Sequence, residues 1–102
     1  MEGYDDFVYN LYKTKTFKKN VKLCYKRNLD LDMLENVIVK LAKREPLPEN
    51  NYPHPLKGYK KKPYEEIMEC HIQPDWLLLW TQNETELILL LTNTGTHSDL
   101  FV

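Results

Sequence analysis

The sequence has little cysteine, no long hydrophobic run and, after Lys62, no lysine or arginine. Cys24 and Cys70 are far apart and form no CxxC pair. Two cysteines exclude a disulfide-rich scaffold and allow at most one disulfide, and this spacing is typical of a reduced protein. The longest apolar stretch, around residues 88–91, is too short to span a membrane. The start, MEGYDDFVY, is acidic and does not resemble a secretory signal. We therefore expect a soluble, cytoplasmic protein without membrane association.

Charge is distributed unevenly along the chain. All 14 lysine and arginine residues fall between Lys13 and Lys62, whereas seven acidic residues and no basic ones follow from Pro63 onward. The net charge of −1 conceals this difference between the two parts. The basic part fits two interpretations, a surface that binds a polyanion or a solvated helical face.

The first part of the chain predicts a strand followed by two helices in a single domain of residues 1–102. Aromatic and apolar side chains alternate over residues 7–13, which favours a strand. Apolar residues at helical spacing predict a helix over about 15–27, which Thr14 or Thr16 could cap. A second apolar stripe predicts a helix over about 32–45, with a capping box at its start and prolines after its end.

The second part predicts a meander of strands. Residues 49–62 are rich in Asn, Pro and Gly and indicate a loop. Three strand-like runs follow, over 66–73, 76–81 and 86–92, with short turns that favour antiparallel pairing. The predicted class is α+β, in the order β-α-α-β-β-β. We expect two layers, a mostly antiparallel sheet with the helix hairpin packed on one face and the other face largely uncovered.

The chain has only three histidines, which are His54, His71 and His97. Alternation along the strand 66–73 puts Cys70 and Ile72 toward the helices, so His71 should lie on the open face. His97 follows the last strand after a glycine turn, and Asp75 occupies the turn after the strand of His71. These side chains could form an acid–base pair with an orienting partner, or they could be ordinary surface residues. A zinc site is a third interpretation, which the long gaps between the histidines do not favour.

Other candidates each fit two roles. Trp76 and Trp80 share the parity of a core leucine, and they could pack in the core or stack on bases. Phe101 could plug the end of the sheet or stack on a nucleobase. Four loop lysines could clamp a phosphate beside His54 or remain solvated, and these are Lys57, Lys60, Lys61 and Lys62.

Four motifs, in this order, resemble one toxin family. HPLKG (54–58), ECHIQPDWLLLW (69–80), ELILLL (86–91) and TGTHSDLF (94–101) resemble the YafQ branch of the RelE/ParE superfamily, the toxins of bacterial type II toxin–antitoxin pairs. The resemblance implies the RelE-like fold and an mRNA interferase, a ribosome-dependent endoribonuclease that cuts translated mRNA in the A site of the 70S ribosome. It also implies a cognate antitoxin of the DinJ/RelB-like kind as partner.

The resemblance also implies which residues act. His54, His71, Asp75 and His97 match the catalytic positions, and Phe101 matches a substrate-contacting one. RNA carries its own nucleophile, the 2′-hydroxyl, so we expect neither a metal nor a cofactor. His97 is the expected general acid, with His71 or Asp75 as base. The RNA phosphate would be steadied by His54 together with the loop lysines Lys57, Lys60, Lys61 and Lys62.

The sequence departs from the family pattern at two positions. Where the family commonly has arginines, this chain has Met68 and Asn93, and we expect this to remove positive charge from the site. One alternative is therefore a catalytically weakened homologue that acts mainly through antitoxin binding and operon autoregulation. Another is a ParE-like topoisomerase poison, although a protein that only binds has no need of the three histidines.

Overall fold

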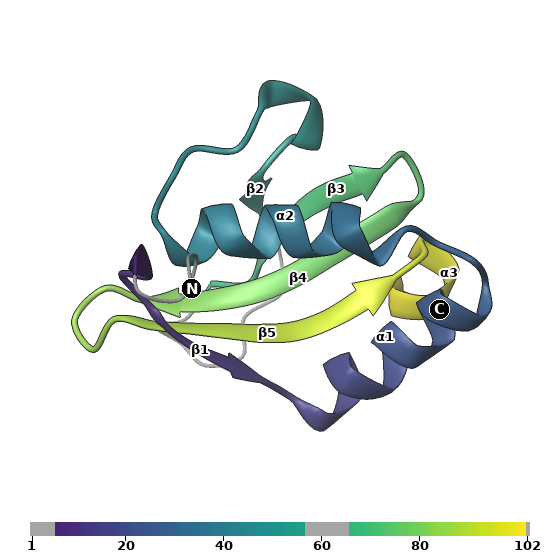
Figure 1. Ribbon diagram of the computed structural model, residues 1–102, viewed down its shortest axis with the longest axis horizontal. Coiled ribbons are helices and arrows are strands. Elements are labelled where there is room, and N and C mark those ends of the chain that lie inside the picture. The colour runs from purple at the N-terminus through teal and green to yellow at the C-terminus, as the bar shows by residue number, and fades with distance from the viewer. Residues whose placement is uncertain (1–5, 57–65, 102) are drawn as a thin grey trace.

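The computed structural model describes residues 6–56 and 66–101. It forms a five-stranded sheet with helices, so the α+β prediction is confirmed (Figure 1). The elements run in the order β1 (Asn10–Lys13), α1 (Lys15–Lys26), α2 (Leu31–Ala42), the 3₁₀ helix η2 (Glu49–Asn51), β2 (His54–Pro55), β3 (Met68–Gln73), β4 (Trp76–Asn83), β5 (Ile88–Gly95) and α3 (His97–Phe101).

The sheet is mostly antiparallel, as predicted. Its strand order is β1-β5-β4-β3-β2, and only the edge pair β1–β5 is parallel. The helices α1 and α2 lie over one face and share a single core with it (Figure 1). The core includes Trp76 and Trp80, which are 2% and 1% exposed, so both tryptophans pack in the core rather than stacking on bases.

The face opposite α1 and α2 is less open than the sequence predicts. Leu77 and Leu79 lie on that face of β4, and their exposed fractions are 0% and 8%. The strand β4 lies at the centre of the sheet, between β5 and β3, and its residues from Trp76 to Thr81 are buried on both faces. The expectation of a largely uncovered second face is therefore wrong along β4.

Caps and left-handed residues set the ends of α1 and α2. The Thr14 hydroxyl accepts a hydrogen bond from the Phe17 amide, which selects Thr14 over Thr16 as the cap of α1. The helix α2 begins earlier than predicted, because Asp30 rather than Asp32 is its cap. It also ends earlier, at a Schellman motif around Arg44, whose φ is 61°.

The C-terminal segment forms a short helix that periodicity did not predict. Gly95 adopts a φ of +153°, and a Cβ there would lie 2.8 Å from Asp99 Oδ2, so only glycine fits where β5 turns into α3. The Thr96 hydroxyl then accepts from the Asp99 amide, and Asp99 Oδ2 accepts from the Thr96 amide. This reciprocal capping box marks the start of α3. Periodicity did not reveal the helix, because five residues are too few to show a helical pattern.

Two further short elements lie in the segment that was predicted as a loop, and these are the 3₁₀ helix η2 and the two-residue strand β2.

In the described ranges, 6–56 and 66–101, we find no helix with the length and apolar character needed to cross a bilayer.

Candidate active site

A series of aromatic rings lies where η2, β3 and α3 meet. Measured between ring centroids, Tyr52 is 4.7 Å from His54 and 6.1 Å from His71. His71 is in turn 6.1 Å from His97, and His97 is 6.2 Å from Phe101. The fold therefore brings the three histidines and Phe101, which span 48 residues of sequence from 54 to 101, into one continuous cluster.

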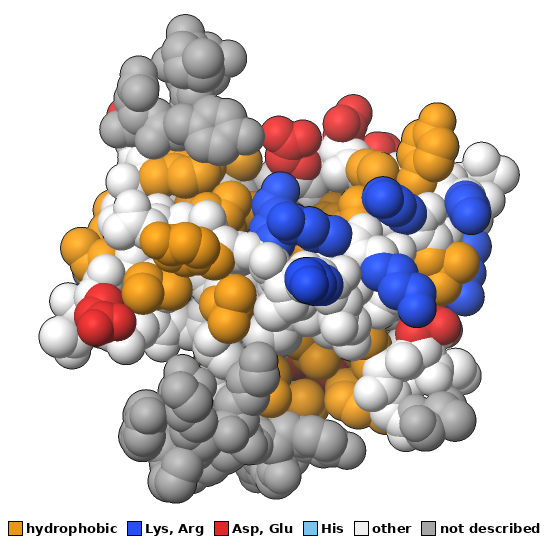
Figure 2. All heavy atoms as spheres, turned by 90° about the horizontal axis from the view of Figure 1, so that it is seen from below, with side chains coloured by type: hydrophobic (Ala, Val, Ile, Leu, Met, Phe, Trp, Pro, Cys, Tyr) orange, Lys and Arg blue, Asp and Glu red, His pale blue; other side chains and the backbone are white. Residues whose placement is uncertain are grey.

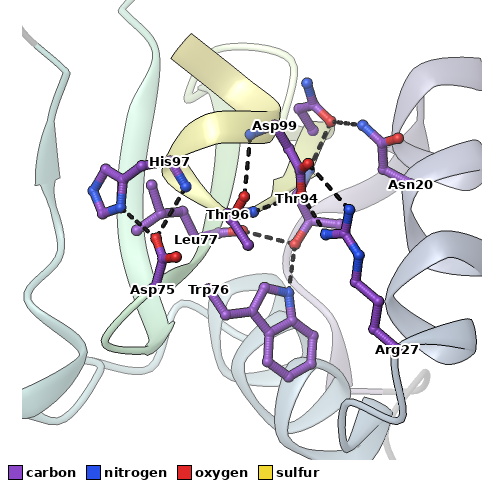
Figure 3. A network of polar contacts seen from close by, with 10 residues as sticks. Asn20, Arg27, Asp75, Trp76, Leu77, Thr94, Thr96, His97 and Asp99 are labelled. Atoms are coloured by element: carbon purple, nitrogen blue, oxygen red, sulfur yellow. Dashed lines mark hydrogen bonds and ion pairs between the residues drawn. The ribbon is translucent and has the colours of Figure 1, made fainter. Parts of the chain in front are cut away.

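His97 and Asp75 form the best-defined pair of the cluster. Nδ1 of His97 lies 2.6 Å from Asp75 Oδ1, and the His97 amide donates to the same oxygen at 3.0 Å (Figure 3). These hydrogen bonds from His97 lower the pKa of the Asp75 carboxyl. An ionised carboxylate accepts from Nδ1–H, so it holds the ring of His97 with Nε2 available for proton transfer.

His71 has a different environment. Its Nδ1 lies 3.2 Å from the carbonyl oxygen of Pro74. A carbonyl can only accept, so Nδ1 carries the hydrogen, and Nε2 of the neutral ring carries the lone pair. The prediction that His71 points away from the helices is confirmed, because Cys70 and Ile72 on either side of it are buried in the core. In this arrangement His71 can accept a proton at Nε2.

Both ring nitrogens of His54 have acceptor partners. Nδ1 lies 2.7 Å from the carbonyl oxygen of Tyr52, and Nε2 lies 2.8 Å from Oε1 of Glu69. Glu69 is buried in β3, directly across from His54 in the register of β2 with β3. Both ring nitrogens of His54 therefore face acceptor oxygens within the protein, and neither is open to take a proton from a substrate.

The helix α3 is anchored to the rest of the fold by polar contacts beneath His97 (Figure 3). Arg27, just after α1, forms two hydrogen bonds to Asp99, at 2.7 and 3.3 Å. The Arg27 guanidinium lowers the pKa of the Asp99 carboxyl to about 2. Deeper in the fold, the Trp76 indole donates to the Thr94 hydroxyl at 3.0 Å, and that hydroxyl donates to the Leu77 carbonyl at 2.7 Å.

The two positions that depart from the family pattern have structural partners of their own. Met68 packs against the core beneath the helices, on the face of β3 opposite His71. The Asn93 side-chain oxygen accepts from Asn20 of α1 at 2.6 Å and from the Thr94 amide at 2.9 Å. Because Met68 lies on the opposite face of β3, it does not lower the positive charge on the face that carries His71, contrary to expectation. Asn93 joins β5 to α1.

The cysteines take no part in this site. Both are free and buried, so no disulfide joins them. Burial raises the pKa of the Cys24 thiol, and it raises the pKa of the Cys70 thiol to about 12.

Over the described residues, no group of three or more His, Cys, Asp or Glu side chains is arranged to hold a metal ion.

Sequence reasoning proposed four of the five rings in this cluster but missed other members. Tyr52 was not predicted. Alternation with Cys70 places Glu69 on the same face of the strand as His71, but sequence reasoning did not single it out as a partner of His54. Tyr52 carried no signal, because its place depends on η2. The predicted phosphate-binding lysines, Lys57, Lys60, Lys61 and Lys62, lie outside the described residues.

Comparison with known proteins decides the family. The model of a family described as the bacterial toxin of type II toxin–antitoxin system, YafQ, matches residues 9–102. The chain belongs to the YafQ family. The mRNA interferase toxin YafQ of Escherichia coli K12 is 34% identical over 86 residues, which are 83% of this chain and 87% of that protein.

Solved structures of YafQ relatives share the fold. The crystal structure of the E. coli DinJ–YafQ toxin–antitoxin complex contains a chain that matches with a TM-score of 0.82 and 30% identity, covering 93% of this chain and 99% of that one. A metal-bound toxin from Helicobacter pylori matches with a TM-score of 0.82 and 35% identity, covering 91% and 99%. The expected RelE-like fold is thus confirmed.

Proposed function

We propose that this YafQ-family toxin is an mRNA interferase that cleaves translated mRNA in the A site of the 70S ribosome. The observation that carries the proposal is the pair of His97 and Asp75 beside His71, with the two histidine rings 6.1 Å apart. Two imidazoles at this separation can each reach an oxygen of one phosphate at about 2.6–3.2 Å. The E. coli relative named an mRNA interferase toxin supports the same activity.

The chemistry needs one base and one acid. Nε2 of His71 takes the proton from the 2′-hydroxyl, and the 2′-oxygen attacks the adjacent phosphorus. The bond from phosphorus to the 5′-oxygen breaks, and Nε2–H of His97 delivers its proton to that leaving oxygen. The products are a 2′,3′-cyclic phosphate and a 5′-hydroxyl. Asp75 accepts from the ring and the amide of His97 and so orients that ring, which leaves His71 rather than Asp75 as the base.

His54 supplies positive charge in this scheme when its ring is protonated. Its contacts with the Tyr52 carbonyl and the Glu69 carboxyl fix the orientation of the ring. A cation already oriented near the reacting phosphate stabilises the charge that develops on the non-bridging oxygens. His54 would thereby supply part of the charge that the family arginine at the position of Asn93 would otherwise supply, with the loop lysines Lys57, Lys60, Lys61 and Lys62 as additional phosphate contacts.

We further propose that cleavage requires no metal, because the 2′-hydroxyl is the nucleophile and the two histidines perform both proton transfers. The H. pylori relative is described as metal-bound, so the point needs a direct test. A transition-metal chelator that leaves Mg²⁺ to the ribosome should not change the cleavage rate. Activity lost on chelation and restored by zinc or copper would contradict this part of the proposal.

The proposed partner is a cognate DinJ-like antitoxin in the bacterial cytoplasm. The solved E. coli relative is a DinJ–YafQ complex. In this chain a groove of about 450 Å³ between α1, α2 and β1 has an apolar floor that includes Phe17 and Leu34 and a rim that includes Lys18 and Lys22. Figure 2 shows basic side chains gathered beside apolar ones on this side of the molecule. Such a surface suits an amphipathic segment with acidic residues.

The deciding experiment is cleavage of mRNA on purified, programmed ribosomes. The wild-type toxin should cut within the A-site codon, and His97→Ala should lower the rate by about 10²–10⁴-fold, the usual contribution of a general acid. A surface variant such as Ser98→Ala, next to His97, controls for folding of α3. Full activity of His97→Ala would overturn the mechanism.

Induction in cells separates the alternative functions. Growth arrest with cleaved messages supports the interferase. Arrest with intact messages and broken DNA would indicate a topoisomerase poison, and the absence of arrest would indicate a weakened toxin that acts through its antitoxin.

A further inference from the structure

We propose that the cavity beside His71 binds the base of the nucleotide on the 5′ side of the cleaved phosphate, with Tyr52 as its stacking platform. The inference rests on the proposed cleavage of mRNA and adds the nucleotide that the site would hold. It concerns a cavity and an aromatic residue that sequence reasoning did not identify.

The cavity lies between η2 and the turn from β3 to β4. Its volume is about 600 Å³, which is within the range of small-molecule pockets. Its walls include Tyr52 and His71, the ring pair whose centroids are 6.1 Å apart, as well as Gln73 and Pro74. The proposed general base therefore forms part of the wall of a cavity large enough for a nucleobase.

Tyr52 is held in position although its ring is exposed. The residue is 65% exposed, and its backbone is left-handed, with a φ of 51°. Its amide donates to the Glu49 carbonyl at 2.9 Å, and its own carbonyl accepts from Nδ1 of His54 at 2.7 Å. The adjacent Asn51 side chain donates to the His71 carbonyl at 2.7 Å. A left-handed tyrosine is unfavourable, and this one is kept in place by contacts to two of the histidine-bearing segments.

These contacts suit a stacking role. The contacts fix the backbone of Tyr52, and its ring lies 4.7 Å from that of His54, so less conformational entropy is lost when a base packs on it than for a residue in an unrestrained loop. Base–aromatic stacking is tolerant of sequence, because every base has a π-face. Amide side chains of Asn50 and Gln73 also line the cavity, and both residues are exposed. Amides can donate to and accept from the edge of a base, so they offer selectivity beyond stacking.

The position of Tyr52 indicates which nucleotide it serves. Tyr52 adjoins His71, which in the proposed mechanism acts on the 2′-hydroxyl of the nucleotide before the cut. Phe101 adjoins His97, which acts on the leaving 5′-oxygen of the nucleotide after the cut. The two aromatic residues would thus hold the two nucleotides that flank the reacting phosphate.

The test uses Tyr52→Asn, because asparagine tolerates a left-handed backbone and lacks the ring. On programmed ribosomes, we expect this variant to cleave about 10- to 100-fold more slowly than wild type, the range expected for the loss of one stacked base. Tyr52→Phe should retain the wild-type rate. A matched control is Tyr12→Ala, because Tyr12 is also exposed but lies on β1, at the opposite edge of the sheet from β2.

A message with an abasic nucleotide on the 5′ side of the cut separates stacking from a structural effect. It should slow the wild-type toxin by the same factor as Tyr52→Asn and slow that variant no further. Equal slowing of both proteins, or a Tyr52→Asn variant as fast as wild type, would overturn the inference. If wild-type toxin and His97→Ala leave the message equally intact, the proposed function fails rather than this addition to it.

Discussion

Replacing Thr94 with valine should destabilise the fold and loosen the site in one step. Thr94 is completely buried. Its hydroxyl accepts a hydrogen bond from the Trp76 indole and donates one to the Leu77 carbonyl (Figure 3). These bonds join β5, which leads to His97, to β4, which follows Asp75. Valine has nearly the same shape, so the change removes these hydrogen bonds without leaving a large cavity.

The expected cost follows from the groups left without partners. The Trp76 indole N–H sits in the core, where its residue is 2% exposed, and water cannot replace the lost acceptor. A buried polar group left unpaired costs about 1–3 kcal/mol. A loss of about 2 kcal/mol in a domain of this size lowers Tm by roughly 8–16 °C.

Urea and thermal unfolding of Thr94→Val measure this loss, with Thr94→Ser as the control that keeps the hydroxyl. We expect the serine variant to be the more stable of the two, even though it lacks the methyl group. Because the hydrogen bonds position both partners of the His97–Asp75 pair, ribosomal cleavage should fall as well. A valine variant as stable as wild type would refute the reasoning that the buried hydroxyl joins the two strands.

Three further predictions concern the site and its anchor. Asp75→Asn should slow ribosomal cleavage about ten-fold, because a neutral amide accepts the hydrogen bond of His97 Nδ1–H more weakly than a carboxylate and orients the ring less firmly; a wild-type cleavage rate would count against the pair. Gly95→Ala should reduce cleavage while the chain stays folded by circular dichroism, because its Cβ would meet Asp99 at 2.8 Å and displace α3; wild-type activity would show that α3 tolerates the shift. Arg27→Gln should be less stable than wild type at neutral pH, and this difference should disappear on acidification. The Asp99 pKa is lowered to about 2, so its contribution is full above the unfolded value near 4 and is lost as the pH falls through about 2; a difference that persists below pH 2 would contradict this.

Local patterns predicted the large elements well. The helices α1 and α2 have apolar stripes several turns long, and Cys70 and Ile72 alternate with His71 in β3, so these elements show their buried faces in the sequence. The strand β4 is apolar from Trp76 to Trp80, so its sequence predicts a strand without marking one buried face. The ends were less accurate, because caps such as Asp30 and left-handed residues such as Arg44 depend on single residues rather than on a repeated pattern.

The family, the residue types that could carry the chemistry and the side of β3 on which His71 lies can all be predicted from the amino-acid sequence. The partner of each of these side chains depends on the tertiary structure. His97 meets Asp75 across 22 residues of sequence, Arg27 meets Asp99 across 72, and His54 meets Glu69 through a strand of two residues. Such long-range contacts produce no periodic pattern of residues in the sequence, because they depend on where the strands end and on which loops the sheet brings together. For that reason the histidines could be named from the sequence, while their hydrogen-bond partners, and the presence of Tyr52 among them, follow from the fold.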